Sequence, residues 1–144
     1  MSLRSADRTL GPVDVALRLA IVALALSTGY IHSTLGGVLF TLNALGYLTA
    51  AVAMVIPLGI AVRFRWFVRL GLIGYAATTI IAWAIQGPYF MTAYVAKAIE
   101  VALIALVAID FARIDGNPLT VVKSELALLS SRLGRRSATG SAGA

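Results

Sequence analysis

Apolar residues fill four long stretches of the chain, and most polar residues lie between these stretches or at the two ends. The apolar stretches run from about Val13 to Ile31, Val38 to Ala61, Val68 to Ile85 and Phe90 to Ala112. A helix that crosses a membrane needs roughly 17–25 mostly apolar residues, because each residue adds about 1.5 Å across a hydrocarbon core of about 30 Å. The pattern therefore predicts four transmembrane helices.

The first stretch has to be compared with a cleavable signal peptide. Residues 23–25, Ala-Leu-Ala, loosely resemble a cleavage site, and Asp14 and Arg18 lie early in the stretch. The apolar run continues without interruption to Ile31, well beyond that site. We therefore expect an intact first helix.

Lysine and arginine are distributed unevenly around the four stretches. The connections 32–37 and 86–89 contain neither residue, whereas the two ends and the middle connection hold Arg4, Arg8, Arg18, Arg63, Arg65, Arg69, Arg113, Lys123, Arg132, Arg135 and Arg136. Short loops rich in Lys and Arg remain in the cytoplasm. The distribution predicts a multi-pass protein of the cell membrane, with both termini and the middle loop on the cytoplasmic side.

The two outer connections are so short that consecutive helices must be antiparallel neighbours. Gly36-Gly37 and Gly87-Pro88 supply residues typical of turns. The expected fold is an all-α membrane protein: an antiparallel four-helix transmembrane bundle over residues 13–113, after a cytoplasmic segment 1–12. Pro57 is expected to bend the inner end of the second helix.

Small residues recur at helical spacing in all four stretches, as in membrane helices that approach closely. They are Ala16, Ala20, Ala23 and Ser27; Gly46, Ala50 and Ala53; Gly71, Gly74, Thr78 and Ala82; and Ala98, Ala102 and Ala105. We expect these faces to form the contacts between helices.

The composition agrees with a lipid-facing exterior. Apolar residues make up 60% of the chain and charged residues 12%, against about 45–50% and about 25% in soluble domains. Cysteine is absent, which excludes disulfides and cysteine metal sites. The net charge of +6 comes mainly from residues that flank apolar stretches, so the expected partner is the lipid bilayer and not nucleic acid.

Lys97 and Glu100 are the ionisable residues deepest in any stretch. Counted inward from Tyr89, Lys97 lies about 12 Å and Glu100 about 16 Å below the outer surface. Their spacing of three places them on one helical face, where they can pair. Two interpretations remain open: a structural ion pair, or a site for a ligand, proton or partner, which is the usual role of ionisable groups inside membranes.

Other polar residues are expected at a similar depth in the outer half of the bundle. The candidate cluster consists of His32, Asn43, Tyr47, Tyr94, Lys97 and Glu100. Convergent polar groups between helices are typical of a small ligand pocket, and a quinone-like molecule or a lipid is the expected occupant. The alternative is that Asn43 and the tyrosines make ordinary interhelical hydrogen bonds, and that His32 is solvated or caps its helix. A single histidine gives no basis for haem or metal chemistry, so no resident cofactor is expected.

Several basic and aromatic residues are expected at the inner membrane surface. They are Arg63, Arg65, Trp66 and Arg69 in the middle loop, and Lys123, Arg132, Arg135 and Arg136 in the tail. We also expect Asp110, in the last turn of the fourth helix, to pair with Arg113 near the headgroups.

The C-terminal part carries a stop signal followed by a new helix. Residues 115–118, Asp-Gly-Asn-Pro, combine a turn glycine, an N-cap and a first-turn proline. An apolar pattern at spacings of three and four follows, which predicts a cytoplasmic amphipathic helix over 114–136; its residues are Leu119, Val122, Leu126, Leu129 and Leu133. This helix binds either the anionic inner leaflet or a partner. Residues 137–144 are small and polar and are expected to be disordered.

Two sequence stretches resemble a family of small four-helix integral membrane proteins of bacteria and haloarchaea. One is Gly29-Tyr30-Ile31-His32 with Leu35-Gly36-Gly37 and Leu42-Asn43-Ala44-Leu45-Gly46-Tyr47-Leu48, and the other is Tyr94-Val95-Ala96-Lys97-Ala98-Ile99-Glu100. The resemblance covers most of residues 13–113 and implies the fold without an activity. The architecture is also similar to that of DoxX-type proteins, which are linked to respiratory or redox systems.

Nucleotide loops, paired-histidine metal motifs and nucleophile elbows are all missing from the sequence. Two functions from different classes remain. The first is a non-enzymatic binding or accessory subunit that uses the outer-half cluster. The second is a small oligomeric transport or proton-handling protein that uses Lys97 and Glu100. The first would have a ligand or a membrane-protein partner, and the second would act as a homo-oligomer.

Overall fold

The computed structural model describes residues 11–57, 64–117, 119–124, 126–127 and 130–131, and these are helical apart from short connections. The chain divides into two compact units, Met1–Asp110 and Phe111–Ala144. Predictions for residues 1–10, Arg63, Arg132, Arg135, Arg136 and 137–144 lie outside the described residues.

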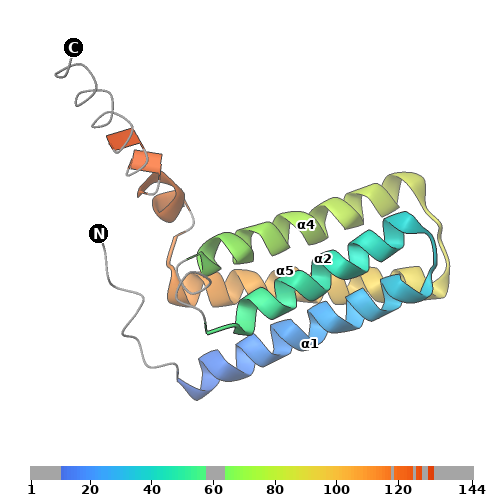
Figure 1. Ribbon diagram of the computed structural model, residues 1–144, viewed down its shortest axis with the longest axis horizontal. Helices are drawn as coiled ribbons and strands as arrows, with labels where there is room; N and C mark the ends of the chain where they lie inside the picture. The colour runs from blue at the N-terminus through green and yellow to red at the C-terminus, as the bar shows by residue number, and fades with distance from the viewer. Residues whose placement is uncertain (1–10, 58–63, 118, 125, 128–129, 132–144) are drawn as a thin grey trace, which may run out of the picture. The chain divides into compact units, whose positions relative to one another are not determined.

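Four helices coincide with the four predicted stretches. They are α1 (Pro12–Thr34), α2 (Val38–Val55), α4 (Arg65–Gln86) and α5 (Met91–Ile114), shown in Figure 1. Among the described residues, α1, α2 and α4 are long and apolar enough to cross a membrane. Helix α5 has 24 residues and is longer than any of these, but it carries Lys97, Glu100 and Asp110.

Helix α2 is shorter than predicted, and Pro57 ends it instead of bending it. The helix stops at Val55, and Ile56 has an extended backbone with φ −59° and ψ 125°. A proline ring clashes with a helical residue immediately before it, so the position before proline is driven out of the α region. The predicted continuation to Ala61 falls partly in 58–63, outside the described residues.

The connections between α1 and α2 and between α4 and α5 are short and lie close to the predicted positions 32–37 and 86–89. Residues 35–37 join α1 to α2, and residues 87–90 join α4 to α5. Gly36, Gly37 and Gly87 have φ values of 72°, 84° and 69°. Only glycine adopts this left-handed region without a steric penalty, so these glycines permit the tight reversals.

Each helix buries one stripe of residues at alternating spacings of three and four. On α5, up to the end of the first unit, the stripe is Ala93, Ala96, Glu100, Leu103, Val107 and Asp110. The matching stripes on the other helices are Ile21, Ala25, Thr28 and His32; Tyr47, Ala51 and Met54; and Arg69, Leu72 and Ala76. This spacing is that of helices packed nearly parallel to one another.

The small-residue faces are not the buried faces that we expected. On α1, α4 and α5 most of them are exposed, for example Ala16, Gly71 and Ala102. The close approaches instead occur at two glycines. A Cβ at Gly29 would lie 3.4 Å from the Ala44 carbonyl oxygen, and one at Gly46 would lie 2.6 Å from the Tyr75 hydroxyl. Larger apolar and polar side chains of the buried stripes fill the centre of the first unit.

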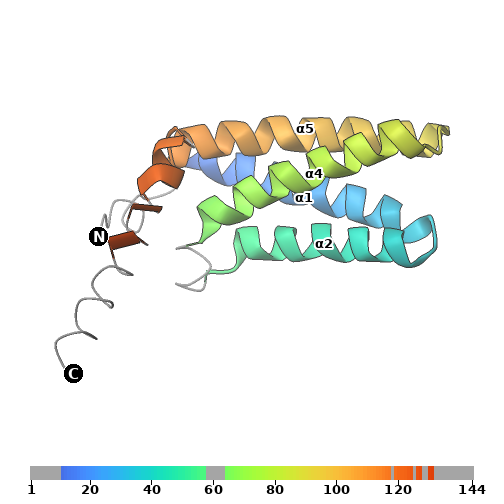
Figure 2. The ribbon, with the colours of Figure 1, turned by 90° about the horizontal axis from the view of Figure 1, so that it is seen from above.

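The four helices of the first unit lie side by side (Figures 1 and 2). Helix α1 packs along α2, and α2 contacts α4. Hydrogen bonds join α5 to both α1 and α4, through Glu100 to Thr28 and Thr79. The core is therefore built by all four helices, and α5 lies opposite α2 across it.

We expect Gly46→Ala to destabilise the first unit by about 1–3 kcal/mol, the usual cost of overpacking a filled interior. The new methyl group would displace the Tyr75 hydroxyl, which donates a 2.7 Å hydrogen bond to Asn43 Oδ1. Gly71→Ala is the matched control, because nothing lies within 4 Å of its added Cβ. Unfolding by SDS titration in mixed micelles measures both variants, and an equal response of the two would contradict this packing.

In the second unit the chain is helical again after the end of α5. The described residues 119–124, 126–127 and 130–131 are helical, and the Leu119 backbone N–H donates to Asn117 Oδ1 at 2.9 Å. Gly116 has a φ of 81°. The turn glycine and the Asn117 cap are thus as predicted, while Pro118 lies outside the described residues.

Candidate functional site

Glu100 of α5 is completely buried and lies at the centre of a polar network. Its side chain accepts hydrogen bonds from Lys97 Nζ at 2.7 Å and Thr79 Oγ1 at 2.8 Å, both to Oε2, and from Thr28 Oγ1 at 3.2 Å to Oε1. These partners come from α5, α4 and α1. Hydrogen bonds from several donors offset part of the cost of burying a polar side chain. We call Glu100 and its partners the outer network.

His32 belongs to this network and is neither solvated nor a simple cap. Its ring is 3% exposed, and Nε2 lies 3.7 Å from Glu100 Oε1. Nδ1 lies 2.8 Å from the Thr28 carbonyl oxygen, which fixes the ring orientation. The ring also packs against Tyr47, with centroids 5.7 Å apart. The last turn of α1 therefore directs this histidine into the protein.

Tyr47 and Asn43 of α2 contact α4 through hydroxyl groups. The Tyr47 hydroxyl lies 3.2 Å from Thr79 Oγ1, and the Tyr75 hydroxyl donates to Asn43 Oδ1 at 2.7 Å. The Tyr47 and Tyr75 rings pack edge to face with centroids 5.0 Å apart. Tyr47 is thereby linked to the outer network, whereas Asn43 is linked to Tyr75 and makes an ordinary interhelical hydrogen bond.

Tyr94 and Lys97 lie towards the surface. Tyr94 is 51% exposed, and its ring packs edge to face on Trp83 with centroids 5.1 Å apart. The structure does not bring Tyr94 into the outer network. The Lys97 side chain is 11% exposed, so it forms the edge of the network that is nearest to the outside.

Two of the three groups that hold Glu100 were not predicted from the sequence, because neither Thr28 nor Thr79 was singled out there. Thr79 Oγ1 lies 2.9 Å from the Ala76 carbonyl oxygen, and it also reaches Glu100. The signal for both was their place in the buried stripes: Thr28 is seven residues after Ile21, and Thr79 is three after Ala76.

A second buried ion pair lies near the inner ends of the helices. Arg69 Nε and Asp110 Oδ2 are 2.6 Å apart, and the two residues are 1% and 0% exposed. Arg69 was expected at the membrane surface, and Asp110 was expected to pair with Arg113. Both residues lie instead in the stripes that α4 and α5 turn towards each other, which brings their charges together inside the protein.

Three other residues expected at the membrane surface can be placed. Arg65 Nη2 donates to the Ile56 carbonyl oxygen at 3.1 Å, near the end of α2. Trp66 is partly exposed and contacts Phe67, with ring centroids 5.8 Å apart. Lys123 is exposed in the second unit.

An apolar layer separates the outer network from the Arg69–Asp110 pair, which we call the inner ion pair. It consists of Ile21, Ala25, Ala51, Met54, Leu72, Ala76, Leu103 and Val107, which form one buried cluster together with Tyr47. Glu100 and Asp110 are ten residues apart on α5, or about 15 Å along the helix. The described residues thus form two polar levels with hydrocarbon between them.

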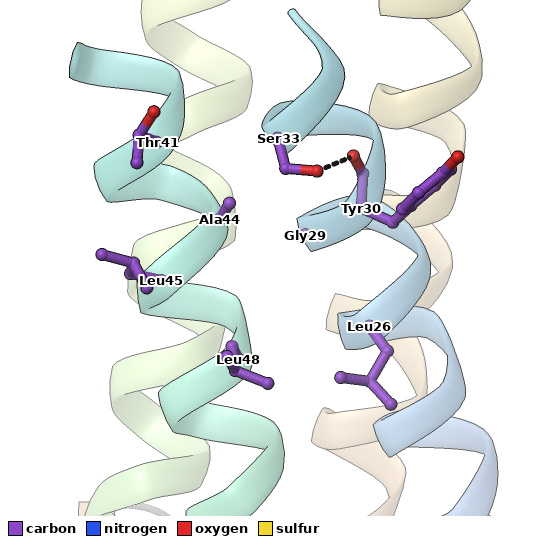
Figure 3. A pocket seen from close by; sticks show the side chains of 8 residues that line it. All are labelled: Leu26, Gly29, Tyr30, Ser33, Thr41, Ala44, Leu45 and Leu48. Carbon is purple, nitrogen blue, oxygen red and sulfur yellow. Dashed lines mark hydrogen bonds between the residues drawn. The ribbon is translucent and has the colours of Figure 1, made fainter. Parts of the chain in front are cut away.

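A groove of about 300 Å³ runs between α1 and α2 (Figure 3). Its walls are mainly apolar: Leu26, Gly29, Tyr30, Ser33, Thr41, Ala44, Leu45 and Leu48. The hydroxyls of Ser33 and Thr41 donate to their own helices, to the carbonyl oxygens of Tyr30 and Gly37. The groove therefore presents hydrocarbon and few polar groups to a ligand.

The network offers few ligands for a metal ion. His32 and Glu100 lie close together, but no third His, Cys, Asp or Glu joins them within the part of the chain that the structure describes. Chemically, the network can bind a proton, or it can bind a ligand whose hydrogen-bond acceptor faces Lys97. The third option is that Lys97 and Glu100 form a structural ion pair only.

Comparison with protein-family models, with curated proteins and with solved structures found no match to this chain. The function is therefore argued from the geometry of the site alone.

Proposed function

We propose that this chain is a non-enzymatic binding or accessory protein of the cell membrane. In this proposal the four helices form an antiparallel transmembrane bundle with both termini in the cytoplasm. The apolar composition of α1, α2 and α4 and the Lys- and Arg-free outer connections support this placement. Helix α5 is the fourth span, and it carries Glu100 and Asp110 on the stripe that it buries.

The observation that carries the proposal is the number of hydrogen bonds that the Lys97 ammonium group makes. Its ammonium group has three N–H donors, and among the described residues Glu100 is the acceptor of one hydrogen bond from it. The side chain is only 11% exposed. Donors held in a membrane without an acceptor are costly, so an acceptor from outside the bundle would be stabilising here.

The charge balance indicates the kind of molecule. Lys97 and Glu100 neutralise each other, and a charged ligand would add an uncompensated charge in a medium of low dielectric constant. A neutral, membrane-soluble molecule with an acceptor oxygen fits best, such as a quinone-like compound or a lipid ester. A polar side chain on a helix of a partner protein presents the same acceptor chemistry.

We expect Lys97→Met to abolish this binding while the bundle still folds. The test is a native mass spectrum of the full chain, extracted in mild detergent from the membrane in which it is expressed. Wild type should carry an additional small molecule or a second protein, and Lys97→Met should lose it. Lys123→Met removes the same charge from an exposed site and should retain the additional mass.

A bare wild-type monomer would contradict the proposal and leave Lys97–Glu100 as a structural pair. Retention of the additional mass by Lys97→Met would place binding elsewhere on the chain. A small molecule identifies a binding protein, and a second polypeptide identifies an accessory subunit.

Proton handling is the second candidate, and the contact between His32 and Glu100 favours it. Two titratable groups 3.7 Å apart can exchange a proton through small movements. The apolar layer argues against a continuous path through one copy of the chain. A bare homo-oligomer whose proton flux in liposomes disappears in Glu100→Gln would replace the binding proposal with this one.

A further inference from the structure

Three charged side chains from three helices come together at the inner end of the first unit. Arg18 lies on α1, and it is within Coulombic range of Asp110 and Arg69 of the inner ion pair and of Asp14. Arg69 and Asp110 lie four residues from the inner ends of α4 and α5, and Arg18 lies six residues from the start of α1. Their α-carbons are therefore about 6–9 Å from the helix ends.

Two carboxylates and a second guanidinium group lie within Coulombic range of Arg18 at this level. Asp110 accepts the Arg69 Nε–H at 2.6 Å. Asp14 lies one turn before Arg18, and its Oδ2 accepts the Gly11 backbone N–H at 3.1 Å, as a cap of α1. Arg18 is thus attracted by both carboxylates, but its Nε–H is hydrogen-bonded to neither of them.

The Arg18 side chain is placed to receive an acceptor from outside the bundle. Its Nε atom is buried, and no acceptor lies within hydrogen-bonding distance of it among the described residues. The residue as a whole is only partly buried. Guanidinium groups bind phosphate oxygens through paired hydrogen bonds better than any other side chain.

We propose that Arg18 binds the phosphate of an anionic phospholipid of the inner leaflet, in a site closed on its inner side by the Arg69–Asp110 pair. Basic sites between helices on the cytoplasmic side are where anionic head groups bind membrane proteins. This inference rests on the membrane placement proposed above, but it is independent of Lys97 and the outer network.

The test is lipid retention by the full-length protein in detergent, measured by native mass spectrometry. Equimolar phosphatidylglycerol and phosphatidylcholine are added, and the ratio of the two bound lipids is recorded. Wild type should prefer phosphatidylglycerol. Arg18→Gln should lower that preference about tenfold, the effect of one lost charge-assisted contact.

Two measurements keep the proposal falsifiable if Arg18→Gln does not fold. Arg18→Lys retains the charge without the planar fork and should show an intermediate preference. Wild type alone is also decisive: equal retention of both lipids overturns the proposal. Equal preference in wild type and folded Arg18→Gln overturns it as well. Displacement of phosphatidylglycerol by millimolar inorganic phosphate would identify free phosphate, not lipid, as the ligand.

Failure of this inference is distinguishable from failure of the proposed function. If carbonate washing removes the chain from membranes, the membrane placement itself is wrong. If the chain stays in the membrane and the additional mass depends on Lys97, the proposed function stands whatever Arg18 does.

Discussion

Asp110→Ala is expected to lower the free energy of unfolding by about 3–5 kcal/mol, the usual cost of removing one partner of a buried ion pair. The loss is large because Arg69 is 1% exposed and would keep its charge without the carboxylate. Arg18 would lose one of its two nearby negative charges at the same time and would keep that of Asp14. Two guanidinium groups would then repel each other at one level of the helices.

The measurement is SDS-induced unfolding in mixed micelles, followed by helix content. The control is the double variant Arg69→Met and Asp110→Leu, which replaces the pair by apolar side chains. Such replacements are often neutral or stabilising, so the double variant should recover most of the loss. A loss below about 1 kcal/mol in Asp110→Ala, the range of exposed pairs, would contradict the burial of this ion pair.

Glu100→Ala is expected to cost about 3 kcal/mol, at the lower end of the range for a broken buried pair. Lys97 is partly exposed, so its flexible stem allows the ammonium group to move towards the surface. Thr28 would lose an acceptor on another helix, whereas Thr79 would keep the Ala76 carbonyl oxygen. Glu100→Gln retains the shape and one acceptor oxygen, so its effect should be smaller.

The same unfolding measurement tests Glu100, with a second comparison in place of the double apolar variant. Thr79→Val removes a donor to Glu100, whereas Thr78→Val removes a hydroxyl that bonds to the Gly74 carbonyl oxygen on an exposed face. Thr79→Val should destabilise, by about 1–3 kcal/mol for an unsatisfied buried partner, and Thr78→Val should not. Equal effects would show that Glu100 does not depend on its α4 partner.

The positions of the helices were largely predictable because each helix coincides with a long apolar run. Each predicted stretch contains a helix, and the ends of three of them were right within a few residues. The exception is α2, where the apolar run continues past Pro57 but the backbone constraint before proline takes effect first. An apolar run predicts which residues can be in the membrane, and it does not determine where the helix stops.

The outer network was only partly predictable. His32, Tyr47, Lys97 and Glu100 come together as expected, because their depths follow from the rise per residue. Rotation of each helix is not fixed by depth, which is why Tyr94 was wrongly included.

Threonine and arginine were harder to interpret than the other polar residues. Threonine hydroxyls usually bond to their own backbone, so the roles of Thr28 and Thr79 depend on which face their helices bury. Arg69 was assigned to the loop because basic residues near helix ends usually lie at the surface. Asp110 lies on a different helix, and only the packing of α4 against α5 reveals the pairing.

The distribution of charge among the helices has a mechanical consequence. Helix α5 is held at two heights, by the hydrogen bonds of Glu100 with Thr28 and Thr79 and by the Asp110–Arg69 ion pair. A slide of one turn, about 5.4 Å, would break these contacts at once. Helix α2, Val38–Val55, contains no ionisable residue. It touches its neighbours through aromatic rings, hydroxyls and the close approach at Gly29. Charged groups thus join helices α1, α4 and α5 to one another. Helix α2 can slide along them without separating a charge from its counter-ion.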